Sequence, residues 1–288
     1  MTLNPAQQKL VARAKRYPFD PPSMSYLFVG DNCWALHDYD SKDPQNASVE
    51  VGGTLQPIHK ALVNHGCEPT DLCVPRIAVL ASGSNASPTR LREKFGPHPG
   101  QTCIPVVKHH VSDVVPVFSA KFASYGSITA TLQYVPGVQS EMFVTYLSEP
   151  QLMSMHATEA IGDEYHFSRI DNVKLGHENG AFTTGPIYAY LSVKEIFQVG
   201  GVQFTLREFE TNAPKTRFVA RSQEAMLELA WNFLERSKDF DVFIYENISD
   251  KNIRRQRNDI LRVYSTPFAN GSVEIIEGSV TRLFKTNG

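Results

Sequence analysis

The chain has 288 residues, 42% of them hydrophobic and 20% charged, so it is long enough to bury a full core. Its net charge is −2 and its basic and acidic residues are interspersed, which disfavours nucleic acid or an anionic membrane as a partner. No apolar run reaches the length of about 18 residues that a membrane span needs, and the N-terminus lacks the apolar core of a secretory signal, so we expect a cytoplasmic protein.

The N-terminal part alternates short elements with polar connections. Residues 5–16 predict a helix, and Tyr26–Val29 predicts a brief strand. The polar stretch Asp38–Ser48 is typical of a loop, and Gly52-Gly53 leads into a helical pattern over Leu55–Val63. We expect residues 1–75 to form an N-terminal extension that packs on the core. The four cysteines have no metal-binding spacing and fit reduced thiols.

A strand, a glycine turn and a helix follow one another in the next segment. The strand is Ile77–Ala81, the turn is Ser82-Gly83-Ser84-Asn85, and Ser87 with Pro88 provides the N-cap and first position of a helix over Thr89–Phe95. This arrangement points backbone N–H groups at one place, where they attract anionic or carbonyl oxygens. The same pattern also fits an ordinary strand–helix connection, and both phosphate-loop motifs are absent.

The middle of the chain predicts mostly strands. Short runs rich in β-branched and aromatic residues, separated by Pro and Gly, are Ile104–Lys108, Val114–Ser119, Ile128–Leu132 and Glu141–Leu147. Pro150–Thr158 has helical spacing, and further strands are expected between Val173 and Phe204. We take residues 76–204 as the core domain. Strands dominating over interspersed helices favour an α+β fold around a mostly antiparallel sheet.

The C-terminal part is predicted to be a helical extension over residues 205–288. Ser222–Arg236 has a good N-cap and an apolar face, and a second helix is expected over Asp250–Val263. This second helix contains the basic cluster Arg254-Arg255-Gln256-Arg257 beside Asp250 and Asp259. We interpret the cluster as a solvated helix face, with phosphate binding as the alternative.

Three features between residues 76 and 170 resemble the γ-glutamylcyclotransferase superfamily, in the order expected there. The turn Ser82-Gly83-Ser84-Asn85 is similar to the family's Tyr-Gly-Ser-Asn loop after a strand. Tyr125-Gly126 is followed by Ala130-Thr131-Leu132 and Pro136-Gly137, as in the family. The stretch from Met155 to Ala160, with Tyr165 downstream, is similar to the family's Leu-Asp-x-x-Glu-Gly.

The resemblance implies a fold, an activity and site residues. The fold is a mixed or antiparallel β-barrel with flanking helices, and the reaction is attack of a substrate's α-amine on its own γ-carbonyl, which releases an amine. By position in the motifs, Glu159 is the catalytic residue, and the substrate-binding residues are Ser82, Gly83, Ser84, Asn85, Tyr125 and Tyr165. Ser82, His156 and Ala160 replace the family's Tyr, Asp and Gly, so we expect a divergent substrate.

The residue type of Glu159 fits a proton-shuttling role. A carboxylate can take a proton from the substrate ammonium and pass one to the leaving nitrogen, and no cation lies near Glu159 in sequence. A solvent-exposed helix glutamate is the simpler interpretation, and Asp163 and Glu164 are competing candidates. The same residues also suit an amidohydrolase with water as nucleophile, or a small-molecule-binding protein without chemistry.

The histidines near Glu159 raise the question of a metal. His156 would share a helix face with Glu159, and His166 is close in sequence, but no zinc-type motif is present. We favour a hydrogen-bonded histidine over a metal ligand. The sequence therefore predicts an enzyme without metal or cofactor, with a small-molecule substrate and no nucleic-acid or membrane partner. Assembly into a homo-oligomer stays open.

Overall fold

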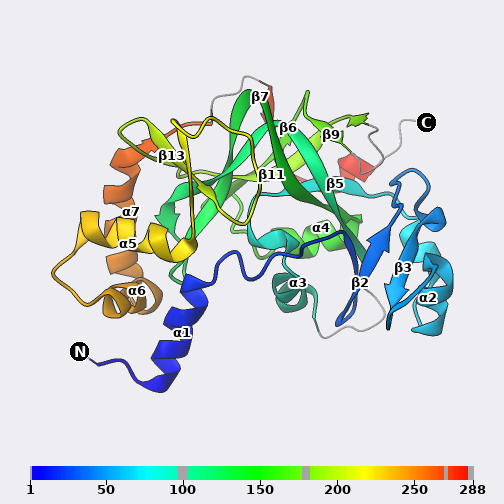
Figure 1. Ribbon diagram of the computed structural model, residues 1–288, viewed down its shortest axis with the longest axis horizontal. Helices are drawn as coiled ribbons and strands as arrows, with labels where there is room; N and C mark the ends of the chain where they lie inside the picture. Colours follow the sequence, from blue (N-terminus) through cyan, green and yellow to red (C-terminus); the bar gives the residue numbers. More distant parts are fainter. Residues whose placement is uncertain (1, 97–102, 177–181, 269–271, 285–288) are drawn as a thin grey trace.

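The computed structural model describes residues 2–96, 103–176, 182–268 and 272–284. A large mixed sheet with flanking helices runs through these residues, so the fold combines α and β structure as predicted (Figure 1). The main path through the sheet is β16-β8-β11-β5-β7-β6-β1-β2-β3-β4. Most neighbouring strands are antiparallel, whereas β11 runs parallel to β5 and β13 parallel to β14.

Two long strands form the centre of the sheet. β6 (Cys103–Phe122) and β7 (Ile128–Leu147) each contain 20 residues and pair antiparallel, where the sequence predicted four short strands. The register shifts between Ser112 and Val114, and Asp113 there has φ 62°. Its carboxylate accepts a hydrogen bond from the amide of Gly137 (2.7 Å). The sequence predicts a break between strands at this polar, glycine-containing segment. In the structure the bulge accommodates the segment within the paired strands.

The predicted barrel is wrong, because the described strands form an open sheet. Besides β7, the long strand β6 pairs with β1, β9, β12 and β13. Successive parts of one bent strand thus have different partners, and the sheet branches at β6 instead of closing. Within the described residues, the main path ends at β4 on one side and at β16 on the other.

The first elements of the chain extend this sheet. α1 (Pro5–Lys15) and β1 (Tyr26–Val29) confirm the predicted helix and strand, and β1 pairs with β6. β2 (Asn32–His37), β3 (Ser48–Val51) and β4 (Thr54–Pro57) follow, and α2 covers only Ile58–Asn64. The predicted helix over residues 55–63 thus begins three residues before the observed helix, which begins at Ile58. Gly52 and Gly53, with φ of 58° and 78°, form the tight turn of the β3–β4 hairpin.

The strand, turn and helix around the glycine turn are confirmed. β5 (Ile77–Ala81) lies between β7 and β11, which explains its continuous apolar run. α3 (Pro88–Phe95) begins at the Ser87 cap and contacts α4 (Glu149–His156). The remaining strands are β8 (Tyr165–Ile170), β9 (Lys174–Gly176), β10 (Phe182–Thr184), β11 (Ile187–Ser192), β12 (Ile196–Val199), β13 (Val202–Leu206), β14 (Phe218–Arg221), β15 (Ser265–Thr266) and β16 (Val273–Ile275).

Three C-terminal helices pack against one another, on the left in Figure 1, and the first two also contact α1. α5 (Gln223–Leu234) begins at the predicted Ser222 cap, and α7 (Lys251–Leu261) matches the second predicted helix, whereas α6 (Phe240–Ser249) is not predicted. The basic cluster on α7 is not wholly a solvated face. Arg257 is only 4% exposed and contacts the carboxylates of Glu235 and Glu246 at 2.5 Å each.

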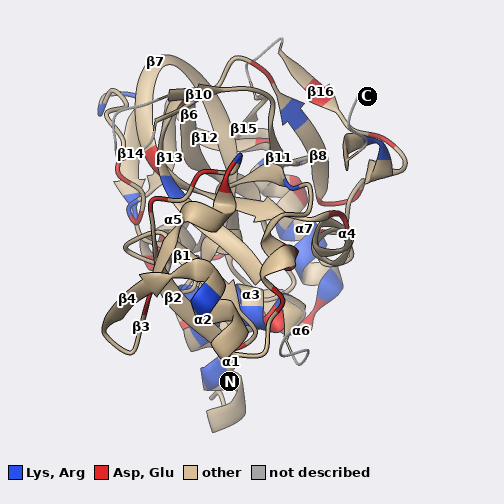
Figure 2. Cartoon of the chain, turned by 90° about the vertical axis from the view of Figure 1, so that its right-hand side faces the viewer, with Lys and Arg blue, Asp and Glu red and all other residues tan. Residues whose placement is uncertain are grey.

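The surface of the described part of the chain agrees with the composition. Basic and acidic segments are interspersed in the view of Figure 2, which also shows the basic residues of α7. None of the helices in the described ranges combines the length and apolar character needed to cross a bilayer. All four cysteines are free thiols, and Cys67 and Cys103 are buried. Burial raises the pKa of Cys103 to about 12.

Candidate active site

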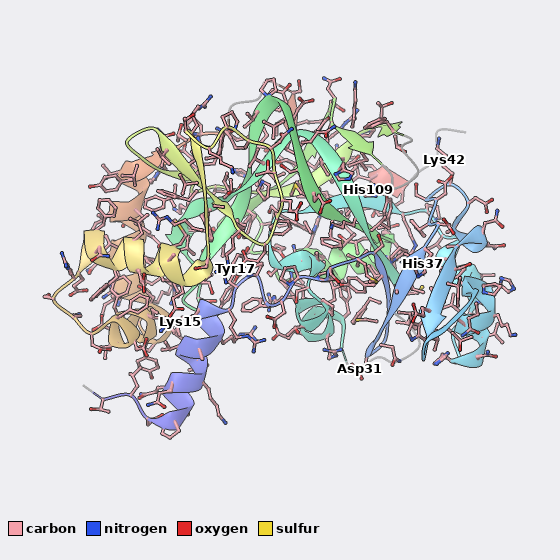
Figure 3. The ribbon with its side chains drawn as sticks, in the orientation of Figure 1. Lys15, Tyr17, Asp31, His37, Lys42 and His109 are labelled. Carbon is pink, nitrogen blue, oxygen red and sulfur yellow. The ribbon has the colours of Figure 1, made fainter. Side chains whose placement is uncertain are left out.

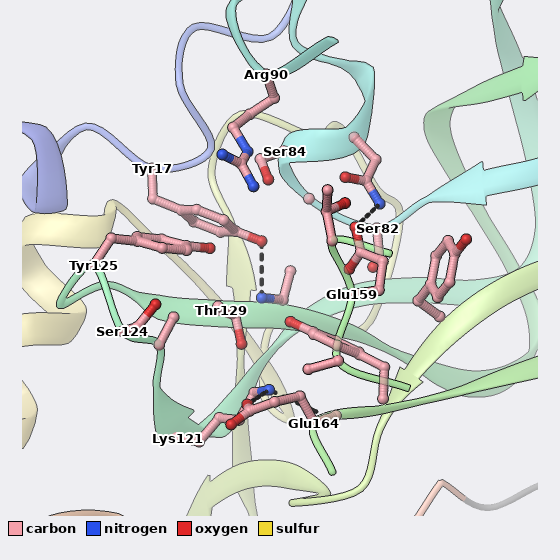
Figure 4. A pocket seen from close by; sticks show the side chains of 18 of the residues that line it. Tyr17, Ser82, Ser84, Arg90, Lys121, Ser124, Tyr125, Thr129, Glu159 and Glu164 are labelled. Atoms are coloured by element: carbon pink, nitrogen blue, oxygen red, sulfur yellow. Dashed lines mark hydrogen bonds and ion pairs between the residues drawn. The ribbon is translucent and has the colours of Figure 1, made fainter. Parts of the chain in front are cut away.

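All seven residues predicted for the site line one pocket (Figure 4). Its cavity volume is about 300 Å³, and its walls come from segments far apart in the sequence. The predicted residues are Ser82, Gly83, Ser84, Asn85, Tyr125, Glu159 and Tyr165. Their common location is a geometric finding, and their roles stay predictions.

The glycine turn reaches the pocket because β5 ends directly before it. Ser84–Ala86 forms a short 3-10 turn, and the Ser87 side chain then accepts a hydrogen bond from the Arg90 amide (3.4 Å). The same hydroxyl donates to the carbonyl of Phe19 (2.5 Å), which ties the loop to the segment after α1. The predicted N-cap is therefore confirmed, and it also positions the N-terminal segment.

Gly83 leaves no room for a side chain. A Cβ at this position would lie 1.9 Å from the hydroxyl oxygen of Tyr17 and 3.0 Å from the Cβ of Ala130. Tyr17 follows α1, as Figure 3 shows, and its hydroxyl accepts a hydrogen bond from the Ala130 amide (3.0 Å). The close approach of the loop to Tyr17 thus depends on glycine.

We therefore expect Gly83→Ala to lose about 1–3 kcal/mol of unfolding free energy, because overpacking displaces Tyr17. Urea denaturation measures this loss. The double variant G83A/Y17F removes the hydroxyl that meets the new methyl group, so it should be more stable than G83A alone. Stability of G83A equal to that of the natural chain would contradict the close packing.

Glu159 lies in the turn directly after α4, which ends at His156, two residues before the end of the helix predicted over residues 150–158. Its side chain is only 10% exposed. One carboxylate oxygen, Oε1, accepts hydrogen bonds from the Asn85 amide group (3.2 Å) and from the Lys94 ammonium. Within the described residues, no donor contacts the second oxygen, Oε2. The loop and the carboxylate are thus joined directly, and one oxygen is left for a ligand.

Lys94 is the most important residue that sequence reasoning missed. Its side chain is 2% exposed, and its ammonium contacts Glu159 and the sulfur of Met155 (3.2 Å). Burial lowers the pKa of Lys94, and the charge of Glu159 opposes that shift. Because α3 begins at the glycine turn and carries Lys94 near its end, one strand–turn–helix unit positions both the loop and the partner of Glu159.

A second ion pair lies on another wall of the pocket. The buried Lys121 ammonium contacts the carboxylate of Glu164 and lies 4.0 Å from the centre of the Tyr165 ring. Burial lowers the pKa of Lys121, and Glu164 opposes the shift. Of the two competing carboxylates, Glu164 therefore lines the pocket in an ion pair, whereas Asp163 is exposed and is not among the lining residues.

Buried tyrosines make up much of the remaining lining. Tyr17 and Tyr125 stack with ring centres 6.5 Å apart. Burial raises the pKa of Tyr125, Tyr165 and Tyr190 well above 10, so their hydroxyl groups stay neutral at physiological pH. They therefore give the pocket hydroxyl groups without adding charge.

His156 contacts Tyr190 through its Nδ1 atom (2.7 Å), which agrees with a hydrogen-bonded histidine. Burial lowers the pKa of His156, and Glu159 opposes the shift. Across the described ranges, no cluster of three or more His, Cys, Asp or Glu side chains could hold a metal ion.

Several lining residues were not predicted, namely Tyr17, Arg90, Lys121, Tyr190 and Arg254. For Arg90 and Lys94 the sequence indicated only a shared face of the predicted helix, because the two residues are four positions apart. The others come from distant elements and carry no local motif.

The chain was also compared with known proteins. No protein-family model matches it, and no curated protein matches it. A solved γ-glutamyl cyclotransferase is 18% identical with a TM-score of 0.33, over 41% of this chain and 67% of that one. The crystal structure of an uncharacterized human protein is 11% identical with a TM-score of 0.34, over 73% and 98% of the two chains. These two likenesses assign no role to any residue.

Proposed function

We propose that this protein is an enzyme that cleaves a small amide-bearing substrate by γ-glutamyl-type cyclotransfer. The observation that supports this most is the contact between Asn85 of the glycine turn and Glu159 at the wall of one pocket. The pocket has the size of a small-molecule site. A carboxylate with one unoccupied oxygen and a turn at a helix start are the two groups that this reaction needs.

In the proposed reaction, Glu159 moves the protons. Its Oε2 atom accepts a proton from the substrate α-ammonium, and the resulting amine attacks the γ-carbonyl carbon. A C–N bond forms to close the ring of 5-oxoproline, and the original amide C–N bond breaks. The leaving nitrogen takes that proton from Glu159. The attacking nitrogen loses a second proton as it becomes the lactam N–H, and Glu159 passes this proton to the departing amine, which leaves as an ammonium, so the enzyme ends in its starting state. Such proton transfer contributes about 10²–10⁴ to a rate.

The glycine turn and the pocket walls supply the rest of the proposed catalysis. Backbone N–H groups of Ser82–Asn85 stabilise the negative charge that develops on the carbonyl oxygen. Tyr17, packed against Gly83, fixes the turn. The walls hold the substrate folded back on itself, and in well-oriented intramolecular reactions this confinement is worth about 7 kcal/mol or more.

A panel of γ-glutamyl compounds and other small amides, screened for released amine, tests the proposal. Cyclotransfer takes no oxygen from the solvent, whereas hydrolysis adds one. We therefore expect that a reaction in ¹⁸O-labelled water gives an acyl product without the label, as mass spectrometry can measure. A labelled carboxylate would establish an amidohydrolase instead, and no amine release from any compound would contradict both activities.

A further inference from the structure

The charges at the pocket are paired, with one exception. Arg90 contacts Glu93 (2.5 Å), Lys121 contacts Glu164, and Lys94 contacts Glu159. Arg254 of α7 also lines the pocket. In the described part of the chain, no carboxylate lies within ion-pair distance of its guanidinium group. Arg254 is thus a lining cation without a carboxylate partner among the described residues.

The guanidinium of Arg254 is held on one side only. Its Nη1 atom donates hydrogen bonds to the backbone carbonyls of Asn247 (2.6 Å) and Ile248 (3.5 Å), at the end of α6. Its Nε and Nη2 atoms have no hydrogen-bond partner among the described residues. These two atoms form the edge of a guanidinium that binds both oxygens of a carboxylate. The carbonyls of α6 therefore fix the side chain and leave this edge to a ligand.

We propose that Arg254 binds a carboxylate of the substrate and so determines which amides the pocket accepts. The choice of compounds below rests on the proposed function. A γ-glutamyl amino acid has two carboxylates, one on the glutamyl part and one on the leaving amine. Both carboxylates can bind Arg254 in the same way, so three matched compounds are used to find which of the two does.

The compounds differ by a single carboxylate each. γ-Glutamyl-alanine has both carboxylates, γ-glutamyl-ethylamide lacks that of the leaving amine, and 4-aminobutyryl-alanine lacks that of the glutamyl part. Binding of each is measured by calorimetry to the full chain carrying Glu159→Gln, so that no turnover interferes. The measurement is repeated with R254M added, and with R255M as a matched control, because Arg255 is exposed and does not line the pocket.

We expect R254M to weaken binding of γ-glutamyl-alanine by about tenfold to a hundredfold, as for the loss of a charged hydrogen-bonded pair. Binding of one of the two other compounds should weaken by the same factor, whereas binding of the other should hardly change. The compound whose affinity hardly changes lacks the carboxylate that Arg254 binds. R255M should leave all three affinities unchanged. Equal weakening of all three compounds in R254M would mean a structural role and overturn the proposal.

Unchanged affinities in R254M, or no binding of any compound to the parent chain, would overturn it as well. The proposed function is judged separately, because turnover is measured on the natural sequence. Selective binding through Arg254 without turnover would contradict cyclotransfer and support this inference. Turnover of all three compounds by the natural chain, together with affinities that R254M leaves unchanged, would support cyclotransfer and contradict this inference.

Discussion

Glu159→Gln is expected to lower kcat by about 10²–10⁴ while leaving the fold intact, because the amide keeps the shape of the side chain but cannot transfer a proton. The Gln oxygen can still accept the hydrogen bonds of Asn85 and Lys94. Burial lowers the pKa of Lys94 and Glu159 opposes this shift, so the lysine gives up its proton more readily when the carboxylate is gone. Turnover of the best compound from the panel measures the effect.

Asp163→Asn is the matched control for this experiment. Asp163 is an exposed carboxylate four residues away and does not line the pocket, so its loss should change kcat less than twofold. Circular dichroism and thermal unfolding establish that both variants are folded. Turnover of a folded Glu159→Gln protein within tenfold of the natural chain would remove Glu159 from the mechanism.

Lys94→Met is expected to affect both stability and activity. Removing one member of a buried ion pair costs about 3–5 kcal/mol of unfolding free energy, because the remaining charge has lost its partner. Glu159 also loses the ammonium that contacts its Oε1 atom, so kcat at neutral pH should fall about tenfold or more. Initial rates and a urea titration measure the two effects.

Two further variants separate charge from packing at Lys94. Lys94→Arg keeps the positive charge beside Glu159, so it should retain more activity than K94M. The double variant K94M/E159Q contains neither charge, so it should be more stable than K94M alone, since neighbouring effects of this kind do not add. If K94M and K94M/E159Q unfolded at the same urea concentration, the ion pair would contribute nothing.

The sequence predicted local structure well where a short motif determines it. Ser87 and Ser222 cap helices at the predicted positions, and Ile77–Ala81 is a strand because its apolar run is flanked by turn residues. The prediction was less accurate where pairing between strands determines how far each strand extends. β6 and β7 continue through polar and proline positions because each strand satisfies the backbone of the other.

The predicted barrel shows a second limit of local patterns. Strand alternation reveals which residues face a core, but it does not show how many partners one strand has along its length. The 20 residues of β6 contact five different strands, and this branching is determined only by the folded chain. The α+β class could therefore be predicted, whereas the closure of the sheet could not.

For the site, the family motifs led to residues that lie together. The sequence could not reveal that Glu159 has an ammonium partner, because Lys94 is far away in the chain and the uncharged surroundings of Glu159 suggested isolation. Tyr17, Lys121 and Arg254 were missed for the same reason. Tyr17 follows α1, Lys121 lies on β6 and Arg254 lies on α7, and only the packing of these distant segments brings the three residues to one cavity.

The participation of Tyr17 and Arg254 has a consequence for how the pocket is completed during synthesis. Tyr17 leaves the ribosome early and contacts Gly83, whereas Arg254 lies on α7 and follows after nearly all of the sheet. A nascent chain that ends before α7 already contains the glycine turn, Lys94 and Glu159, but it lacks Arg254. The groups proposed to transfer protons are thus translated before the residue proposed to bind the substrate carboxylate.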